Sequence, residues 1–137
     1  MEIGINNKNV EIGNISFSNN KSFNLIAGPC VLESKQHAID ICGKLKDIAD
    51  NLNLGLIYKS SFDKANRTSL KSSRGIGLDE SLDIFSLIKS EFKVPVITDV
   101  HEPEQCKIVS ETVDVIQIPA FLCRQTDLLI AAAKTGK

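Results

Sequence analysis

The sequence has 137 residues, of which 42% are hydrophobic and 24% are charged. This length is enough for one hydrophobic core and too short for two ordinary domains, so we expect residues 1–137 to form a single domain. The 16 basic and 17 acidic residues give a formal net charge of −1, which argues against a whole-molecule field that would attract nucleic acid or an anionic membrane.

No apolar run approaches the roughly 20 residues that a membrane helix needs, and the first residues are acidic and rich in asparagine, unlike a signal peptide. We therefore expect no membrane partner and a cytoplasmic location. The four cysteines form no C-x-x-C pair and show no spacing typical of a zinc ribbon or a disulfide framework, so we interpret them as free thiols.

The first elements expected along the chain are a hairpin, a strand and a helix. Short apolar pieces at about residues 9–18 are interrupted by Gly13-Asn14, a dipeptide typical of hairpin turns. An apolar run follows at residues 23–28 and stops at Gly28-Pro29. The next apolar residues, from Ala38 to Leu52, recur at spacings of three and four, which predicts an amphipathic helix with Ser34 as its N-cap.

The rest of the chain continues this alternation. We expect strands at residues 55–60, 94–100 and 113–119, and helices at 78–92, 103–111 and 126–136. Strands that are apolar almost throughout, separated by helices, predict an α/β fold with a parallel sheet covered by helices. About four βα units are visible, whereas a (β/α)8 barrel needs eight. A small doubly wound sheet and half a barrel fit this pattern equally well.

Polar residues concentrate directly after the expected strands, at the edge of the sheet where ligands bind in either architecture. The densest segment, residues 59–75, carries five basic residues and one acidic residue, Asp63. Such side chains suit phosphate groups, because bonds from charged donors are the strong ones. The alternative is a solvated basic loop, but a loop this long without apolar periodicity favours a functional role.

Three cysteines and one histidine have alternative interpretations. Cys30 follows the first parallel strand, so it is either a small buried hydrophobe or a thiolate that acts as a metal ligand or nucleophile. His101 follows Asp99 by two residues; we favour a structural or rim-lining role over a catalytic one. Cys42 lies on the apolar stripe of its helix and Cys106 on the next short helix, and we assign both to packing.

Six segments, in this order, resemble the motifs of 3-deoxy-D-manno-octulosonate 8-phosphate synthases: AGPCVLES, KSSFDKANRTS, RGIGLDE, ITDVHEP, IQIPAFLCRQTDLL and AKTG. The resemblance covers nearly the whole chain from the hairpin onward. KANRTS is the most discriminating piece, because the sister family that makes 3-deoxy-D-arabino-heptulosonate 7-phosphate has a KPRT-type motif there.

The resemblance implies an aldolase-type (β/α)8 TIM barrel with an N-terminal hairpin at its bottom, usually in a homotetramer. It implies that this chain is the first half of that barrel and stops after about the fourth βα unit. The implied reaction belongs to lipopolysaccharide precursor synthesis. C3 of phosphoenolpyruvate attacks the aldehyde of D-arabinose 5-phosphate, water adds at C2, and inorganic phosphate leaves with C–O cleavage.

The resemblance also implies roles for residues of this chain. Lys64 would lie between the two substrates, while Asn66 and Asp99 would contact the sugar hydroxyls and the aldehyde. The residues implied in substrate binding are Lys59, Ser61, Arg67, Thr68, Gln117, Pro119, Ala120 and Phe121. Arg67 and Thr68 would hold the distal phosphate of the sugar. Pro119, Phe121 and Arg124 belong to a stretch that reaches a neighbouring subunit in the family.

Cys30 is implied as a ligand of a divalent metal ion, because family members with cysteine at this position use a metal and members with asparagine do not. Zinc, iron, manganese and cobalt all fit a mixed sulfur, nitrogen and oxygen site. The other ligands are expected in later strands that this sequence lacks.

We expect the isolated chain to be inactive, because a half barrel would expose two unpaired strand edges and one open apolar face. Two alternatives stay open. One is the sister heptulosonate synthase, which would use erythrose 4-phosphate. The other is a half barrel that binds phosphosugars without turnover.

Overall fold

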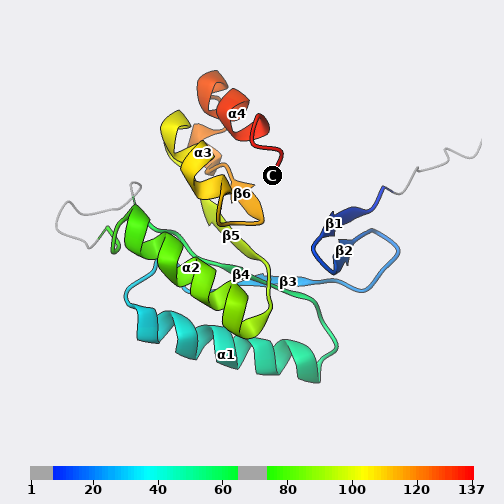
Figure 1. Cartoon of the computed structure of the whole chain (residues 1–137). Coiled ribbons are helices and arrows are strands. Elements are labelled where there is room, and N and C mark those ends of the chain that lie inside the picture. The colour runs from blue at the N-terminus through cyan, green and yellow to red at the C-terminus, as the bar shows by residue number, and fades with distance from the viewer. Residues whose placement is uncertain (1–7, 65–73) are drawn as a thin grey trace, which may run out of the picture.

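The computed structural model describes residues 8–64 and 74–137. Its elements confirm the expected alternation (Figure 1). In chain order they are β1 (Val10–Ile12), β2 (Ile15–Phe17), β3 (Leu25–Ala27), α1 (Lys35–Asn51), β4 (Leu56–Lys59), α2 (Leu78–Phe92), β5 (Val96–Asp99), α3 (Pro103–Ser110), β6 (Val115–Gln117), the 3-10 helix η1 (Ala120–Leu122) and α4 (Thr126–Ala133).

The order of the strands selects the barrel over the doubly wound sheet. The four parallel strands lie in the order β3-β4-β5-β6, so each strand is added at the same edge as the one before it. A doubly wound sheet reverses direction at a switch point, and the described strands do not. With right-handed crossovers, sequential addition places the connecting helices on one face. The chain therefore has the architecture of the first half of a (β/α)8 barrel.

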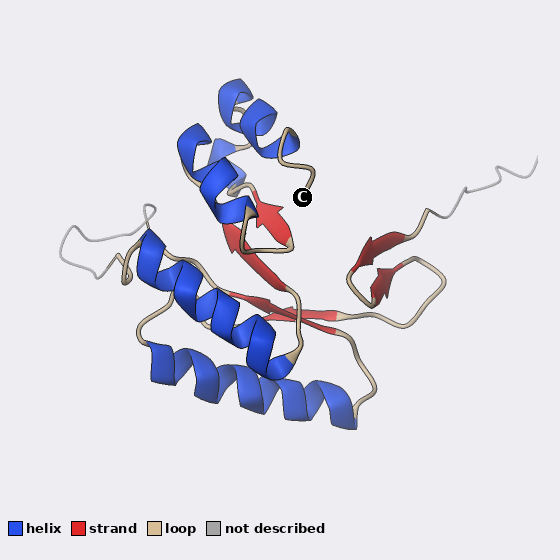
Figure 2. Ribbon diagram, viewed as in Figure 1, coloured by secondary structure: helices blue, strands red, loops and turns tan. Residues whose placement is uncertain are grey.

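The hairpin lies on the other side of this sheet from α1 and α2 (Figure 2). Gly13 has φ of 59°, the left-handed conformation that a tight hairpin turn requires and that glycine adopts without strain. Asn24 ties the hairpin to the sheet, because its Nδ2 donates to the Ser16 carbonyl at 2.9 Å and its Oδ1 accepts from the Gly55 amide at 3.2 Å. Since Gly55 directly precedes β4, the hairpin lies at the N-terminal ends of the strands.

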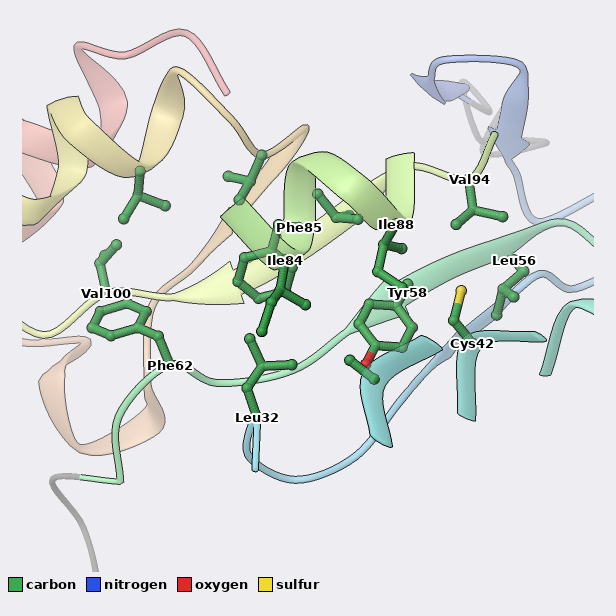
Figure 3. Close-up of a cluster of buried hydrophobic side chains, with 14 of the residues drawn as sticks. Leu32, Cys42, Leu56, Tyr58, Phe62, Ile84, Phe85, Ile88, Val94 and Val100 are labelled. Carbon is green, nitrogen blue, oxygen red and sulfur yellow. The ribbon is translucent and has the colours of Figure 1, made fainter. Parts of the chain in front are cut away.

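Two apolar layers hold the sheet. Leu56 and Tyr58 face the helices and join the main core with Phe85 and Ile88 of α2 (Figure 3). Ile57 points to the opposite face, where hairpin residues including Ile15 cover it. The residues that share this second layer are Ile12, Ile15, Phe17, Ile57, Ile97 and Val115. The hairpin thus closes the lower end of the half barrel.

The cysteines assigned to packing are buried, with 0% of Cys42 and 1% of Cys106 exposed. Burial raises the pKa of the Cys42 thiol to about 12. The expected helix start is also confirmed, because the hydroxyl of Ser34 accepts a hydrogen bond from the His37 amide at 3.2 Å. All four cysteines are free thiols.

Strand β3 and the residues just after it are partly exposed. Ile26 is 47% exposed, because β3 is an edge strand of the described sheet and the hairpin covers Ile57 and Ile97 instead. Cys30, just beyond β3, is exposed, so its interpretation as a small buried hydrophobe is wrong. Among the described residues, no helix combines the length and the apolar character that crossing a membrane requires.

Candidate active site

The last residues of three neighbouring strands open into one cavity of about 630 Å³, which we call the main cavity. Lys59, Asp99 and Gln117 end β4, β5 and β6, and each follows a residue of the second apolar layer by two positions. Because strand side chains alternate between faces, these polar groups stand on the face opposite the helices. The residues that line the main cavity are Lys59, Ser61, Asp63, Lys64, Asp99, His101, Gln117, Pro119, Ala120, Phe121 and Leu122.

The chain directly after β4 is held by bonds to both neighbouring strands. The hydroxyl of Ser60 donates to the Pro29 carbonyl at 2.8 Å, and the Ser60 carbonyl accepts from the Thr98 hydroxyl at 2.7 Å. Gly28 lies so close that a Cβ atom there would be 1.9 Å from the Lys59 carbonyl oxygen. These contacts fix the backbone that carries Lys59 and Ser61 into the main cavity.

Two lysines supply positive charge to the same wall. Lys59 ends β4, and Lys64 lies just beyond it with its ammonium group donating to the Ser61 hydroxyl at 2.8 Å. A pair of lysines that share a cavity wall suits an anionic ligand, because each offers several charge-assisted donors.

Asp99 and His101 form the most buried polar pair of the wall. Nε2 of His101 lies 3.1 Å from Oδ2 of Asp99, and the side chains are 13% and 11% exposed. Burial alone would raise the pKa of Asp99, but hydrogen bonds from His101 and Ser61 outweigh it and lower the pKa to about 2. Asp99 is therefore a carboxylate at neutral pH.

His101 is held in place from two other directions. Its ring meets the Phe62 ring edge-on, with centroids 5.5 Å apart, and its amide donates to Oε1 of Gln105 at 2.8 Å. Oδ1 of Asp99 and Nδ1 of His101 are buried and have no hydrogen-bond partner among residues 8–64 and 74–137. Since buried polar atoms are nearly always satisfied, these two atoms have capacity for a ligand or water.

Most of the residues that the sequence predicted for the site are brought together. The eight that line the main cavity are Lys59, Ser61, Lys64, Asp99, Gln117, Pro119, Ala120 and Phe121. Asn66, Arg67 and Thr68 lie outside the described residues. Cys30 does not line the main cavity, although its carbonyl accepts from the Ser61 amide at 3.4 Å.

Three lining residues were not assigned to the site from sequence. Asp63 and Leu122 gave no signal beyond their position near expected strand ends. His101 is a rim-lining residue, as favoured, and its spacing of two from Asp99 was the available signal. The helix η1 was not expected; it turns Ala120 and Phe121 toward the main cavity directly after Pro119.

The described residues supply at most part of a metal site. The thiol of Cys30 is exposed and chemically suited to a zinc or iron ion. However, no three Cys, His, Asp or Glu side chains gather closely enough to hold an ion within residues 8–64 and 74–137. Within residues 8–64 and 74–137, Cys30 is therefore a single candidate ligand and not part of a complete metal site.

Comparison with known proteins identifies relatives of about twice this length. A 2-dehydro-3-deoxyphosphooctonate aldolase of Brucella anthropi is 61% identical over 131 residues, which are 96% of this chain and 47% of the relative. Proteins of the same name from Brucella ovis and Brucella canis are 60% identical over the same shares. The chain thus spans about half the length of these relatives. A model of the DAHP synthetase I family matches residues 2–137, so the chain belongs to that family.

Proposed function

We propose that this chain supplies the N-terminal half of a synthase that joins phosphoenolpyruvate to D-arabinose 5-phosphate. The observation that carries the proposal is the main cavity, in which Lys59, Lys64, Asp99 and Gln117 converge at the carboxyl ends of the strands. This is the end at which barrel enzymes carry their active sites. The names of the similar Brucella proteins support the octonate product.

The proposed reaction makes one C–C bond and one C–O bond to the oxygen of water, and it breaks the C–O bond to phosphate. C3 of phosphoenolpyruvate attacks the aldehyde carbon, and the aldehyde oxygen takes a proton to become a hydroxyl. Water adds at C2, the C2–O bond breaks, and inorganic phosphate leaves. Both substrates carry phosphate groups, so their approach is opposed by charge repulsion that nearby cations reduce.

The two lysines have distinct proposed roles. Lys59 and Gln117, with the backbone at Ala120, bind phosphoenolpyruvate. Lys64 lies between the two substrates and stabilises the negative charge that develops on the aldehyde oxygen. Its bond to the Ser61 hydroxyl at 2.8 Å supports this role, because it orients the ammonium group before substrates bind.

Asp99 faces the sugar in this proposal, together with Asn66. The low pKa of Asp99 keeps it ionised, so it acts as an acceptor for sugar hydroxyls. Nε2 of His101 donates to Asp99 and fixes the direction of the carboxylate. Arg67 and Thr68 are proposed to hold the distal phosphate of the sugar.

A divalent ion bound by the Cys30 thiolate would act as a Lewis acid toward the aldehyde or the attacking water. A homo-oligomer is also proposed. The observation that supports it is Phe121, which is 81% exposed beside the main cavity. An aromatic side chain this exposed fits a contact with a second copy of the protein.

The test measures phosphate release from phosphoenolpyruvate plus D-arabinose 5-phosphate with added divalent metal. The chain is assayed alone and with the C-terminal half of the Brucella anthropi aldolase supplied in trans. Activity only with the added half is expected. Turnover by the chain alone would contradict the proposed incompleteness. If neither sample releases phosphate while the intact relative is active, the result would favour a half barrel that binds phosphosugars without turnover.

The name of the matching family leaves a second aldehyde substrate open, because it refers to the heptulosonate synthetases. Erythrose 4-phosphate should therefore be compared with D-arabinose 5-phosphate in the same assay. A higher kcat/KM with erythrose 4-phosphate would show that the four-carbon sugar is the preferred substrate, while the proposed reaction type would stay the same.

A further inference from the structure

One carboxylate is out of place in a cavity proposed to bind phosphates. Asp63 lines the main cavity between Ser61 and Lys64, and its side chain is only 19% exposed. A partly buried negative charge there repels an anionic ligand, since neighbouring groups of low polarity strengthen the interaction. Its effect on the cavity depends on what neutralises it.

Arg74 neutralises Asp63 through a bidentate ion pair. Nε of Arg74 donates to Oδ1 of Asp63 at 2.8 Å, and Nη2 donates to Oδ2. The hydrogen bond from Arg74 is the main reason that the pKa of Asp63 lies below its usual value. This fork geometry is specific to arginine, so the pair fixes the position of the carboxylate as well as its charge.

The pair sits between two cavities. Asp63 lines both the main cavity and a second cavity of about 310 Å³, whereas Arg74 lines only the second. The guanidinium group, with 57% of the side chain exposed, approaches Asp63 from outside the main cavity. Arg74 therefore does not line the main cavity itself, and Asp63 is the side chain that links it to that cavity.

The charges around the main cavity show why the neutralisation of Asp63 by Arg74 affects anion binding. Among the described lining residues, Lys59 and Lys64 carry positive charge, whereas Asp63 and Asp99 carry negative charge. These four described charges cancel one another. Arg74 adds the positive charge that leaves this neighbourhood favourable to an anion.

The backbone links Arg74 to Lys64 as well. The Lys64 amide donates to the Arg74 carbonyl at 2.7 Å, so the two residues are joined side by side. At the next position, a Cβ on Gly75 would lie 2.4 Å from the Phe62 carbonyl oxygen, and φ there is 117°. Only glycine allows this close approach. The backbone at Lys64 is thus held close to the backbone at Arg74 and Gly75.

We propose that Arg74 is a positioning residue that sets the anion affinity of the main cavity by neutralising Asp63 and holding it away from the ligand. The proposal rests on the proposed function for the nature of the ligand, and names a determinant of affinity that does not itself touch that ligand.

The test is a double-mutant cycle read by calorimetric titration of the chain with inorganic phosphate and with phosphoenolpyruvate. Arg74→Gln should weaken binding about tenfold, because the charge of Asp63 is then uncompensated. Asp63→Asn in the same chain should restore binding to within about twofold of the unsubstituted protein. The tenfold loss should shrink when salt is raised from about 50 mM to about 500 mM.

Two further variants make the test specific. Arg74→Lys keeps the charge without the fork and should bind within about threefold of the unsubstituted chain. Lys46→Gln removes an equal charge from the exposed Lys46–Asp50 pair on α1 and should leave phosphate binding unchanged.

Three results would overturn the proposal: normal binding by Arg74→Gln, a double variant as weak as Arg74→Gln, or no phosphate binding by the unsubstituted chain. Circular dichroism of each variant identifies loss of fold, and Arg74→Lys then decides between charge and structure. Because the readout is equilibrium binding, a cycle that behaves as expected in a chain that stays without synthase activity even when the C-terminal half is supplied in trans would contradict the proposed function alone.

Discussion

Nε2 of His101 lies 3.1 Å from Oδ2 of Asp99 in a wall where both side chains are nearly shielded from solvent. The pair lies where two strand ends meet, because Asp99 ends β5 and is the register partner of Gln117, which ends β6. A buried carboxylate is tolerated only when donors surround it. His101 and Ser61 are those donors.

The ionisation of Asp99 should make stability depend on acid pH. Its pKa falls from 3.8 to about 2 on folding, so the folded state favours the charged form. The resulting stabilisation, about 2 kcal/mol, is complete above about pH 5 and is lost as the pH falls from about 4 toward 2. Urea unfolding of the parent and Asp99→Asn should differ by a pH-dependent amount in this range. A difference that stays constant with pH would contradict the assignment.

Replacing glycine with alanine should have opposite effects on the free energy of unfolding at Gly28 and at Gly43. Gly28→Ala should lower the free energy of unfolding by about 2 kcal/mol or more, because the new Cβ meets the Lys59 carbonyl oxygen at 1.9 Å. Gly43→Ala, inside α1, should raise it by up to about 1 kcal/mol, because the nearest atom of Phe92 is at 3.5 Å and alanine favours helix. Chemical denaturation measures both. Equal effects of the two substitutions would show that the close approach at Gly28 is not restrictive.

Asp114 should matter more to stability than an exposed aspartate of the same fold. It accepts from Lys89 at 2.9 Å and from the Val96 amide at 2.9 Å, so it joins α2 to the start of β5. Asp114→Ala should cost about 1–2 kcal/mol, because the Val96 amide loses its partner. Asp50→Ala, which breaks the exposed pair with Lys46, should cost less than about 0.5 kcal/mol. Thermal melting of the two variants compares them directly.

Local signals in the sequence predicted most of the fold. Gly13-Asn14 marked the hairpin turn, Ser34 marked the start of α1, and the apolar periodicity marked α2 at the residues where it is found. Each signal acts within a few residues, through a turn conformation or a cap, so tertiary structure does not change it. The position of the site followed from the strand pattern, because parallel strands place their carboxyl ends together, whereas the roles of single residues came from the family resemblance.

Long-range packing decided the rest. The order of the strands, which selects the barrel, depends on contacts between residues far apart in the chain, and apolar periodicity carries no information on it. The exposure of Ile26 depends on where the hairpin packs. Asp63 and Arg74 are eleven positions apart and meet only in the folded chain, so local sequence signals do not predict their ion pair.

Metal content should depend on both halves of the barrel. The described residues offer the Cys30 thiol but no cluster of three ligands, so the isolated chain should retain little zinc or iron after dialysis. Mixed with the C-terminal half of the Brucella anthropi aldolase, it should hold about one equivalent. Cys30→Ala should abolish this gain, whereas Cys123→Ala, at another exposed thiol, should not. Atomic emission measures the metal, and equal loss in the two variants would exclude Cys30 as the ligand.

Lys64 should contribute more to the chemical step than to substrate binding. Its ammonium group is oriented by Ser61 within the main cavity, where charge develops on the aldehyde oxygen in the proposed reaction. Lys64→Met keeps much of the side-chain volume and removes the charge. In the reconstituted synthase it should lower kcat by about 100-fold or more and change the KM for phosphoenolpyruvate by less than about tenfold. Lys46→Met, on the exposed face of α1, is the control and should leave both constants unchanged. A raised KM with an unchanged kcat would instead assign Lys64 to ground-state binding, because an interaction made equally before and during the reaction does not accelerate it.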